Sequence, residues 1–88
     1  MIKISVSEPL RRYCSNADIL FGDGGSVLEV LKDASKDFPE LKKKLFSTEN
    51  TLSSRVLIYK NLKDIRFLQK ENTPVDSTAE LKLVVALC

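Results

Sequence analysis

The segment from Gly22 to Phe38 combines a glycine-rich turn with the start of a well-capped amphipathic helix. Ser26 is a natural N-cap residue. Glu29, three positions later, completes a capping box, in which two side chains satisfy backbone N–H groups at the start of a helix. Apolar residues recur at helical spacing up to Phe38, with charged residues on the opposite side. In a chain of 88 residues, which has room for one modest core, such a helix must pack on another layer.

Strand-like segments lie on both sides of this helix. Met1–Val6 alternates apolar and polar residues, which is typical of a half-buried strand. The other predicted strands are Ala17–Phe21, Arg55–Lys60, Ile65–Leu68 and Glu80–Leu87. A short second helix is predicted for Glu40–Phe46. Irregular connections or turns are predicted for Ser7–Ser15, where Pro9 disfavours a central strand, and for Ser47–Ser54, Asn61–Asp64 and Gln69–Thr78.

This order of elements predicts an α+β fold in a single domain spanning residues 1–88. One main helix packs across a mixed sheet of four to five strands, and a short second helix is possible. If the first and last strands lie side by side in the middle of the sheet, the arrangement is the β-grasp, or ubiquitin-like, fold.

Composition excludes several kinds of function. The net charge is only +2, which gives nucleic-acid binding no support. The chain has no histidine, so a Ser–His or Cys–His nucleophile pair cannot form, and two cysteines cannot build a four-ligand metal site. We therefore expect no catalytic residue, no metal, no cofactor and no enzyme activity of its own. No apolar run could span a membrane, and we expect a cytoplasmic protein with free thiols, with Cys14 as a small, partly buried apolar residue.

Two motifs permit more than one interpretation. The run Gly22-Asp23-Gly24-Gly25-Ser26 precedes a helix N-terminus that could hold an anion, but it lacks the lysine of a P-loop, so a strand-to-helix turn is favoured. The run Lys42-Lys43-Lys44 indicates either a solvated helix face or a charged patch for an acidic partner. Arg11 and Arg12 carry the same two interpretations.

The ordered motifs along the chain resemble the MoaD/ThiS family of ubiquitin-like sulfur carriers. The resemblance covers nearly the whole chain and includes the opening strand Ile2–Val6, the segment Pro9–Tyr13, the helix start Ser26–Leu31, Phe38–Leu41, Val56–Asn61, Asp64–Leu68 and the closing strand. It implies a protein that is acted on by partners. An adenylating, E1-like enzyme activates the terminal carboxylate, sulfur transfer makes a thiocarboxylate, and a sulfur-accepting enzyme receives the sulfur in cofactor (for example molybdopterin) or amino-acid biosynthesis.

The closing residues differ from the pattern of these carriers, whose last strand runs into a Gly-Gly tail. Here Leu87 and Cys88 are the nearest match to the carrier tail, with Cys88 about where a residue just before the diglycine would lie. Three explanations stay open. The tail was removed from this sequence, the protein is a diverged relative used for binding only, or Cys88 has a chemical role of its own.

A partner-docking surface is predicted on the sheet. If Val56, Ile58, Leu83 and Val85 face the helix, then Leu57, Tyr59, Val84 and Ala86 lie on the opposite face. An exposed apolar patch on a small domain marks a partner site, and Arg11 and Arg12 would add charge to it. The alternatives are that loops cover this face or that the register is shifted by one residue, which would exchange the two sets. The second candidate function is therefore a ubiquitin-like interaction module without covalent carrier chemistry.

Overall fold

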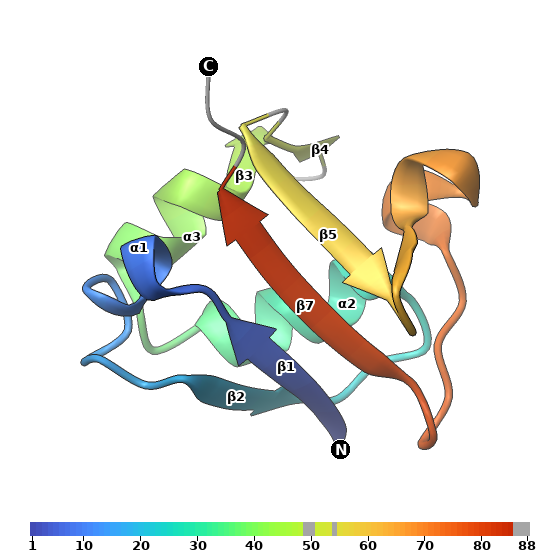
Figure 1. Cartoon of the computed structure of the whole chain (residues 1–88), viewed down its shortest axis with the longest axis horizontal. Helices are drawn as coiled ribbons and strands as arrows, with labels where there is room; N and C mark the ends of the chain where they lie inside the picture. Colours follow the sequence, from blue (N-terminus) through green and yellow to red (C-terminus); the bar gives the residue numbers. More distant parts are fainter. Residues whose placement is uncertain (49–50, 54, 86–88) are drawn as a thin grey trace.

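The computed structural model describes residues 1–48, 51–53 and 55–85, and its main sheet has the strand order β2-β1-β7-β5-β6 (Figure 1). The five strands are β1 Ile2–Val6, β2 Ile19–Gly22, β5 Val56–Lys60, β6 Lys63–Asp64 and β7 Glu80–Val85. β1 and β7 run parallel, side by side, and the other neighbouring pairs are antiparallel. The first and last strands thus occupy the middle of the sheet, and the predicted β-grasp arrangement is confirmed.

The core lies between this sheet and two helices, α2 Val27–Ser35 and α3 Pro39–Leu45. Figure 1 shows α2 crossing behind β1 and β7. Alternate residues of the strands point toward the helices, because successive side chains of a strand lie on opposite faces. The largest fully buried hydrophobic side chains are Ile4, Leu31, Leu41, Leu45, Leu81 and Leu83. Over the described residues, no helix combines the length and the apolarity needed to cross a bilayer.

The glycine-rich segment before α2 is a tightly packed strand-to-helix turn. The Ser26 hydroxyl oxygen accepts a hydrogen bond from the Glu29 N–H at 3.4 Å, and the Glu29 carboxylate accepts one from the Gly25 N–H at 3.2 Å. The Val27 N–H donates to the Thr73 carbonyl at 3.0 Å, so another part of the chain already occupies one exposed donor of this helix end. The capping residues were predicted correctly, and the favoured interpretation of this turn is confirmed.

Close packing explains two of the glycines in this turn. A Cβ atom at Gly22 would overlap the carbonyl oxygen of Val30, and one at Gly24 would come within 2.6 Å of the Glu29 Cβ. No described glycine has a positive φ. The glycines are therefore required for the close approach of the turn to α2, not for a left-handed backbone.

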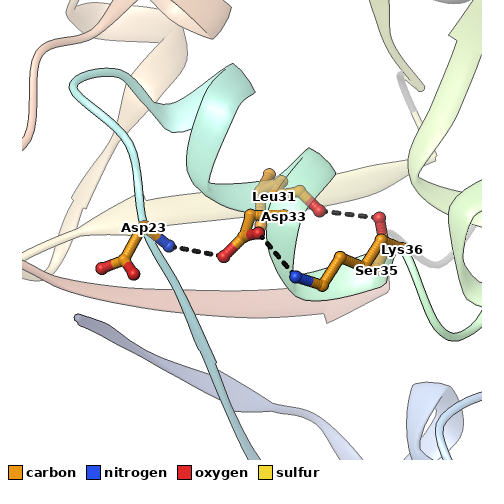
Figure 2. A network of polar contacts seen from close by, with 5 residues as sticks. All are labelled: Asp23, Leu31, Asp33, Ser35 and Lys36. Carbon is orange, nitrogen blue, oxygen red and sulfur yellow. Dashed lines mark hydrogen bonds and ion pairs between the residues drawn. The ribbon is translucent and has the colours of Figure 1, made fainter.

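Helix α2 ends at Ser35, three residues earlier than the apolar spacing up to Phe38 predicted. Figure 2 shows the polar contacts at this end: Asp33 accepts hydrogen bonds from the Asp23 N–H at 2.8 Å and from the Lys36 ammonium at 3.2 Å. Both hydrogen bonds lower the pKa of the Asp33 carboxyl, and the bond from Asp23 has the larger effect. The buried Ser35 hydroxyl donates to the Leu31 carbonyl at 2.7 Å. Pro39 then begins α3, the predicted second helix.

Two segments predicted as irregular contain regular structure. Within Ser7–Ser15 lies a short helix, α1 Glu8–Arg11, because Pro9 occupies one of the first helical positions, where its missing N–H costs nothing. The second segment, predicted as Ser47–Ser54, contains most of a separate two-stranded sheet. In it, β3 Phe46–Thr48, which begins one residue before the segment, pairs with β4 Thr51–Leu52. The prediction of unstructured connections was wrong at both places.

The prediction of a strand at Ile65–Leu68 was also wrong. Residues Lys63–Asp64, predicted as part of a turn, pair with β5 as β6, and a 3₁₀ helix, η1 Ile65–Phe67, follows. The Asp64 carboxylate accepts the Arg66 N–H at 2.9 Å and binds the Arg66 guanidinium at 2.8 and 3.0 Å. A second 3₁₀ helix, η2 Lys70–Asn72, lies in the connection to β7. The Asp64 cap thus turns an apolar run away from the sheet.

Candidate partner-binding face

The sheet has one face that neither α2 nor α3 covers, called the open face below. Its side chains alternate along each strand with the buried ones. The open face consists of Lys3 and Ser5 of β1, Ile19 and Phe21 of β2, Leu57 and Tyr59 of β5, and Glu80, Lys82 and Val84 of β7.

The predicted docking residues meet on this face. Leu57 lies directly opposite Val84, and Tyr59 lies opposite Lys82, in the antiparallel pair of β5 and β7. All three predicted side chains, Leu57, Tyr59 and Val84, are half-buried, whereas Ile58 and Leu83 are buried in the core. The predicted register is therefore confirmed for the described residues. Ala86, the fourth predicted residue, lies outside them.

Sequence reasoning missed a second apolar part of the open face. Phe21 is 54% exposed and Ile19 is 37% exposed, both on the edge strand β2. Lys3 pairs with Phe21, and Ser5 pairs with Ile19 and with Lys82. A polar stripe along the middle of the face therefore separates this β2 pair from Leu57 and Val84. The apolar run Ala17–Phe21 was the available signal, but only the strand order shows that this strand has an uncovered edge.

A hollow of about 300 Å³ opens between β7 and the tip of the β5–β6 hairpin. Its lining is Ser5, Tyr59, Asn61, Leu62, Glu80, Leu81 and Lys82. Leu62 is 88% exposed and has a φ of 73°, which is a costly conformation for a leucine. The neighbouring Asn61 fixes the tip, since its N–H and its side-chain oxygen bind the Glu80 carbonyl and N–H at 2.9 and 3.0 Å. An apolar side chain is thus held outward beside Tyr59.

The end of β7 lies in the interior of the sheet, not at an edge. Val85, its last residue, pairs with Val56 at the start of β5, and the Ser7 N–H donates to the Leu83 carbonyl at 3.1 Å on the other side. The chain therefore leaves the sheet between β1 and β5. Leu87 and Cys88, the residues matched to the carrier tail, lie outside the described residues.

The two predicted docking arginines have different surroundings. The Arg11 guanidinium donates to the Val6 carbonyl at 3.0 Å, a contact that ties α1 to the end of β1. Arg12 is exposed, and its guanidinium carbon lies 5.7 Å from the centre of the Tyr13 ring. Arg12 lines a groove with Tyr13 and Arg55 and is absent from the lining of the hollow beside Tyr59. The structure thus places Arg12 beside a separate surface.

Cys14 is an interior residue, as predicted, and it is fully buried where only partial burial was expected. Burial raises the pKa of its thiol, while the charge of Arg11 opposes that shift. The thiol also donates a hydrogen bond to the Ala17 carbonyl at 3.5 Å. Within residues 1–48, 51–53 and 55–85, no three potential ligands among Cys, Asp and Glu gather as they would around a metal ion. The open face offers apolar contact area and charge rather than reactive groups.

No family model matches the sequence, and no curated protein matches it. Several solved structures match over nearly the whole chain. A chain of the Amycolatopsis orientalis BexX/CysO complex is 22% identical, with a TM-score of 0.89 and coverage of 100% of this chain and 98% of that one. CysO of Mycobacterium tuberculosis, an antigen, is 20% identical, with a TM-score of 0.87 and coverage of 99% and 100%. Small archaeal modifier protein 1 of Methanosarcina acetivorans is 22% identical, with a TM-score of 0.88 and coverage of 98% and 92%. The chain shares the fold of these proteins.

Proposed function

We propose that this chain is a sulfur carrier of the MoaD/ThiS type. An adenylating partner activates its terminal carboxylate, and it donates sulfur in cofactor or amino-acid biosynthesis. The observation that carries the proposal is the shared fold, since the three similar structures belong to ubiquitin-fold sulfur carriers and modifiers, and the match extends over at least 98% of this chain. In such a protein the carrier supplies a carboxylate and a docking surface, and partners supply nucleotide and catalytic groups.

Two features of the chain support this role. First, the described part of β7 ends between β1 and β5, inside the sheet and not at its edge. Second, Leu57, Tyr59 and Val84 provide an apolar contact area on the open face, beside the outward-facing Leu62. The complex of CysO with BexX is a precedent, in a protein of this fold, for a protein partner.

The proposed activation has two steps. An oxygen of the terminal carboxylate attacks the α-phosphorus of ATP, and pyrophosphate leaves. A nucleophilic sulfur delivered by the partner then attacks the carbonyl carbon, and AMP leaves with the bonding electron pair. The partners carry out both steps, which is why the carrier needs no base of its own. We place this chemistry in the cytoplasm.

Pyrophosphate exchange tests the first step. The native protein is purified with the adenylating enzyme that accompanies it, and incorporation of labelled pyrophosphate into ATP is measured with and without the carrier. The proposal predicts exchange that depends on the carrier and is lost in a Leu57→Lys, Val84→Lys variant that still folds. Exchange that is equally fast without the carrier would contradict it.

The second candidate function is an interaction module without covalent chemistry. The exposed apolar side chains favour it, because Phe21, Leu62 and Phe67 could anchor a permanent partner without activation of the chain end. This candidate predicts a stable complex with a partner that has no adenylating activity, and no pyrophosphate exchange.

A further inference from the structure

A basic groove lies away from the open face, between α1, α3 and the start of β5. Its volume is about 630 Å³, and no open-face residue lines it. The described residues of its lining are Pro9, Leu10, Arg12, Tyr13, Lys43, Lys44, Phe46, Ser47, Ser53, Arg55 and Val56. This basic groove plays no part in the proposed chemistry, so its composition requires a separate explanation.

Three separate segments bring positive charges to the groove. Arg12 follows α1, Lys43 and Lys44 lie in the last turn of α3, and Arg55 precedes β5. No described residue of the lining is acidic. Lysines in a last helical turn have a local explanation, because they complement the helix dipole. That explanation does not cover Arg12 and Arg55, which approach the same hollow from other parts of the chain.

The positive side chains of the groove have few acidic partners, and two of them contact the Tyr13 ring. The Tyr13 ring has the Arg12 guanidinium carbon at 5.7 Å and the Lys44 ammonium at 5.4 Å from its centre, within cation–π range. Lys43 has a weak pair with Glu40 at 3.9 Å, with both side chains mostly exposed. Among the described residues, no ion pair neutralises Arg12, Lys44 or Arg55. Like charges gathered in this way favour an incoming anion.

The base of the groove determines which anion fits. Leu10, Phe46 and Val56 are buried core residues that also line it, so apolar side chains lie beneath the charges. A single-stranded nucleic acid would need aromatic faces for its bases, but Arg12 and Lys44 already lie over the Tyr13 ring. A peptide with carboxylates alternating with apolar side chains matches both the cationic rim and the apolar base.

We propose that the basic groove binds an acidic segment of a partner protein. Val56 lines the groove and also pairs with Val85, so the bound segment lies next to the point where β7 ends. A partner that takes the chain end could thus also contact the groove. The inference goes beyond the proposed function, because the groove would bind an acidic segment whether or not the carboxylate is activated.

Peptide titration tests this binding. The probe is a fluorescein-labelled peptide that alternates Glu with Leu, and its anisotropy is followed as the full chain is added. Its control replaces every Glu with Gln. We expect the acidic peptide to bind, the Gln peptide to bind at least about tenfold more weakly, and added salt to weaken binding through screening. Amide shifts in NMR spectra should concentrate on Tyr13, Lys44 and Arg55.

A pair of variants with equal net charge separates the groove from general basicity. Lys44→Gln with Arg55→Gln removes two groove charges and should weaken acidic-peptide binding by about tenfold. Lys42→Gln with Lys63→Gln removes two exposed charges outside the groove and should change binding less than about twofold. Equal losses in the two variants would overturn the proposal. So would peptide-induced shifts confined to the open face, or tighter binding of a single-stranded oligonucleotide or of phosphatidylserine vesicles.

Discussion

Leu57 on β5 lies directly opposite Val84 on β7, and both side chains point away from the helices. The next pair along the same two strands, Ile58 and Leu83, points to the other face and is buried in the hydrophobic core. One strand pair therefore serves stability on one side and presents contact area on the other.

Substitution of adjacent residues in β7 should separate the two roles. Leu83→Ala removes a fully buried side chain and should lower the free energy of unfolding by about 2–5 kcal/mol. Val84→Ala, on the half-buried open face, should lower it by less than about 1 kcal/mol. Urea denaturation of both variants measures the difference. Equal losses would show that β7 does not have one buried and one open side.

A charge on the open face should impair partner binding without unfolding the protein. Leu57→Glu places a carboxylate where the partner would desolvate it and should weaken binding by at least about 2 kcal/mol, as for a hot-spot residue. Ser77→Glu, at an exposed position in the loop before β7, is the matched control and should bind normally. Calorimetric titration with the co-purified partner, together with melting curves, checks both variants. Normal partner binding by Leu57→Glu would argue against docking at this face.

Much of the central architecture could be predicted because its signals are local. Ser26 and Glu29 mark the start of α2, and alternation in β1 and β7 indicates which side chains are buried. One departure from the prediction follows from a single side chain that changes the backbone path. Asp64 caps η1 and converts Ile65–Phe67 from an expected strand into a 3₁₀ helix, although the apolar composition of these residues suits a strand.

The surfaces were harder to predict than the core because they combine distant segments. Exposure of Phe21 follows from the edge position of β2, which depends on the strand order. The basic groove likewise joins Arg12 to Lys44 and Arg55 only after α1 and α3 have packed. From the sequence, the interpretation of Lys42-Lys43-Lys44 stayed open. The structure places Lys43 and Lys44 in the lining and leaves Lys42 out of it.

The glycines before α2 should differ sharply in their tolerance of a methyl group. Gly22→Ala forces an overlap with the Val30 carbonyl oxygen and should cost about 1–3 kcal/mol of stability. A Cβ atom at Gly25 meets no atom within 4 Å, and its φ is not positive, so Gly25→Ala should be neutral or stabilise by up to about 1 kcal/mol. Thermal denaturation compares the two. A tolerated Gly22→Ala would contradict the close packing of this turn on α2.

Acid should destabilise the fold partly through Asp64. The Arg66 guanidinium, through its hydrogen bond, lowers the pKa of the Asp64 carboxyl. A lowered folded pKa means that the stabilisation is fully present above the unfolded value of about 4 and is lost as the pH falls through the folded pKa. Asp64→Asn should therefore be less stable than the native chain at neutral pH, and the two melting curves should converge in acid.

Melting temperatures measured from neutral pH into acid check this convergence, and Asp37→Asn is the control for net charge. Asp37 is exposed and has no ion pair within the described part of the chain. A constant difference between Asp64→Asn and the native chain at every pH would contradict the contribution of the Asp64–Arg66 pair to acid sensitivity.

Intact-protein mass spectrometry of the native gene product, purified from its own cells, tests the carrier function most directly. We predict a fraction of molecules in which one sulfur replaces one oxygen, localised by fragmentation to the terminal carboxylate. An alkylating reagent should add its alkyl group to this sulfur, and the sulfur-accepting enzyme should remove the sulfur. A terminal carboxylate that never carries sulfur, even when the protein is isolated together with its adenylating partner and a sulfur source, would contradict the carrier function.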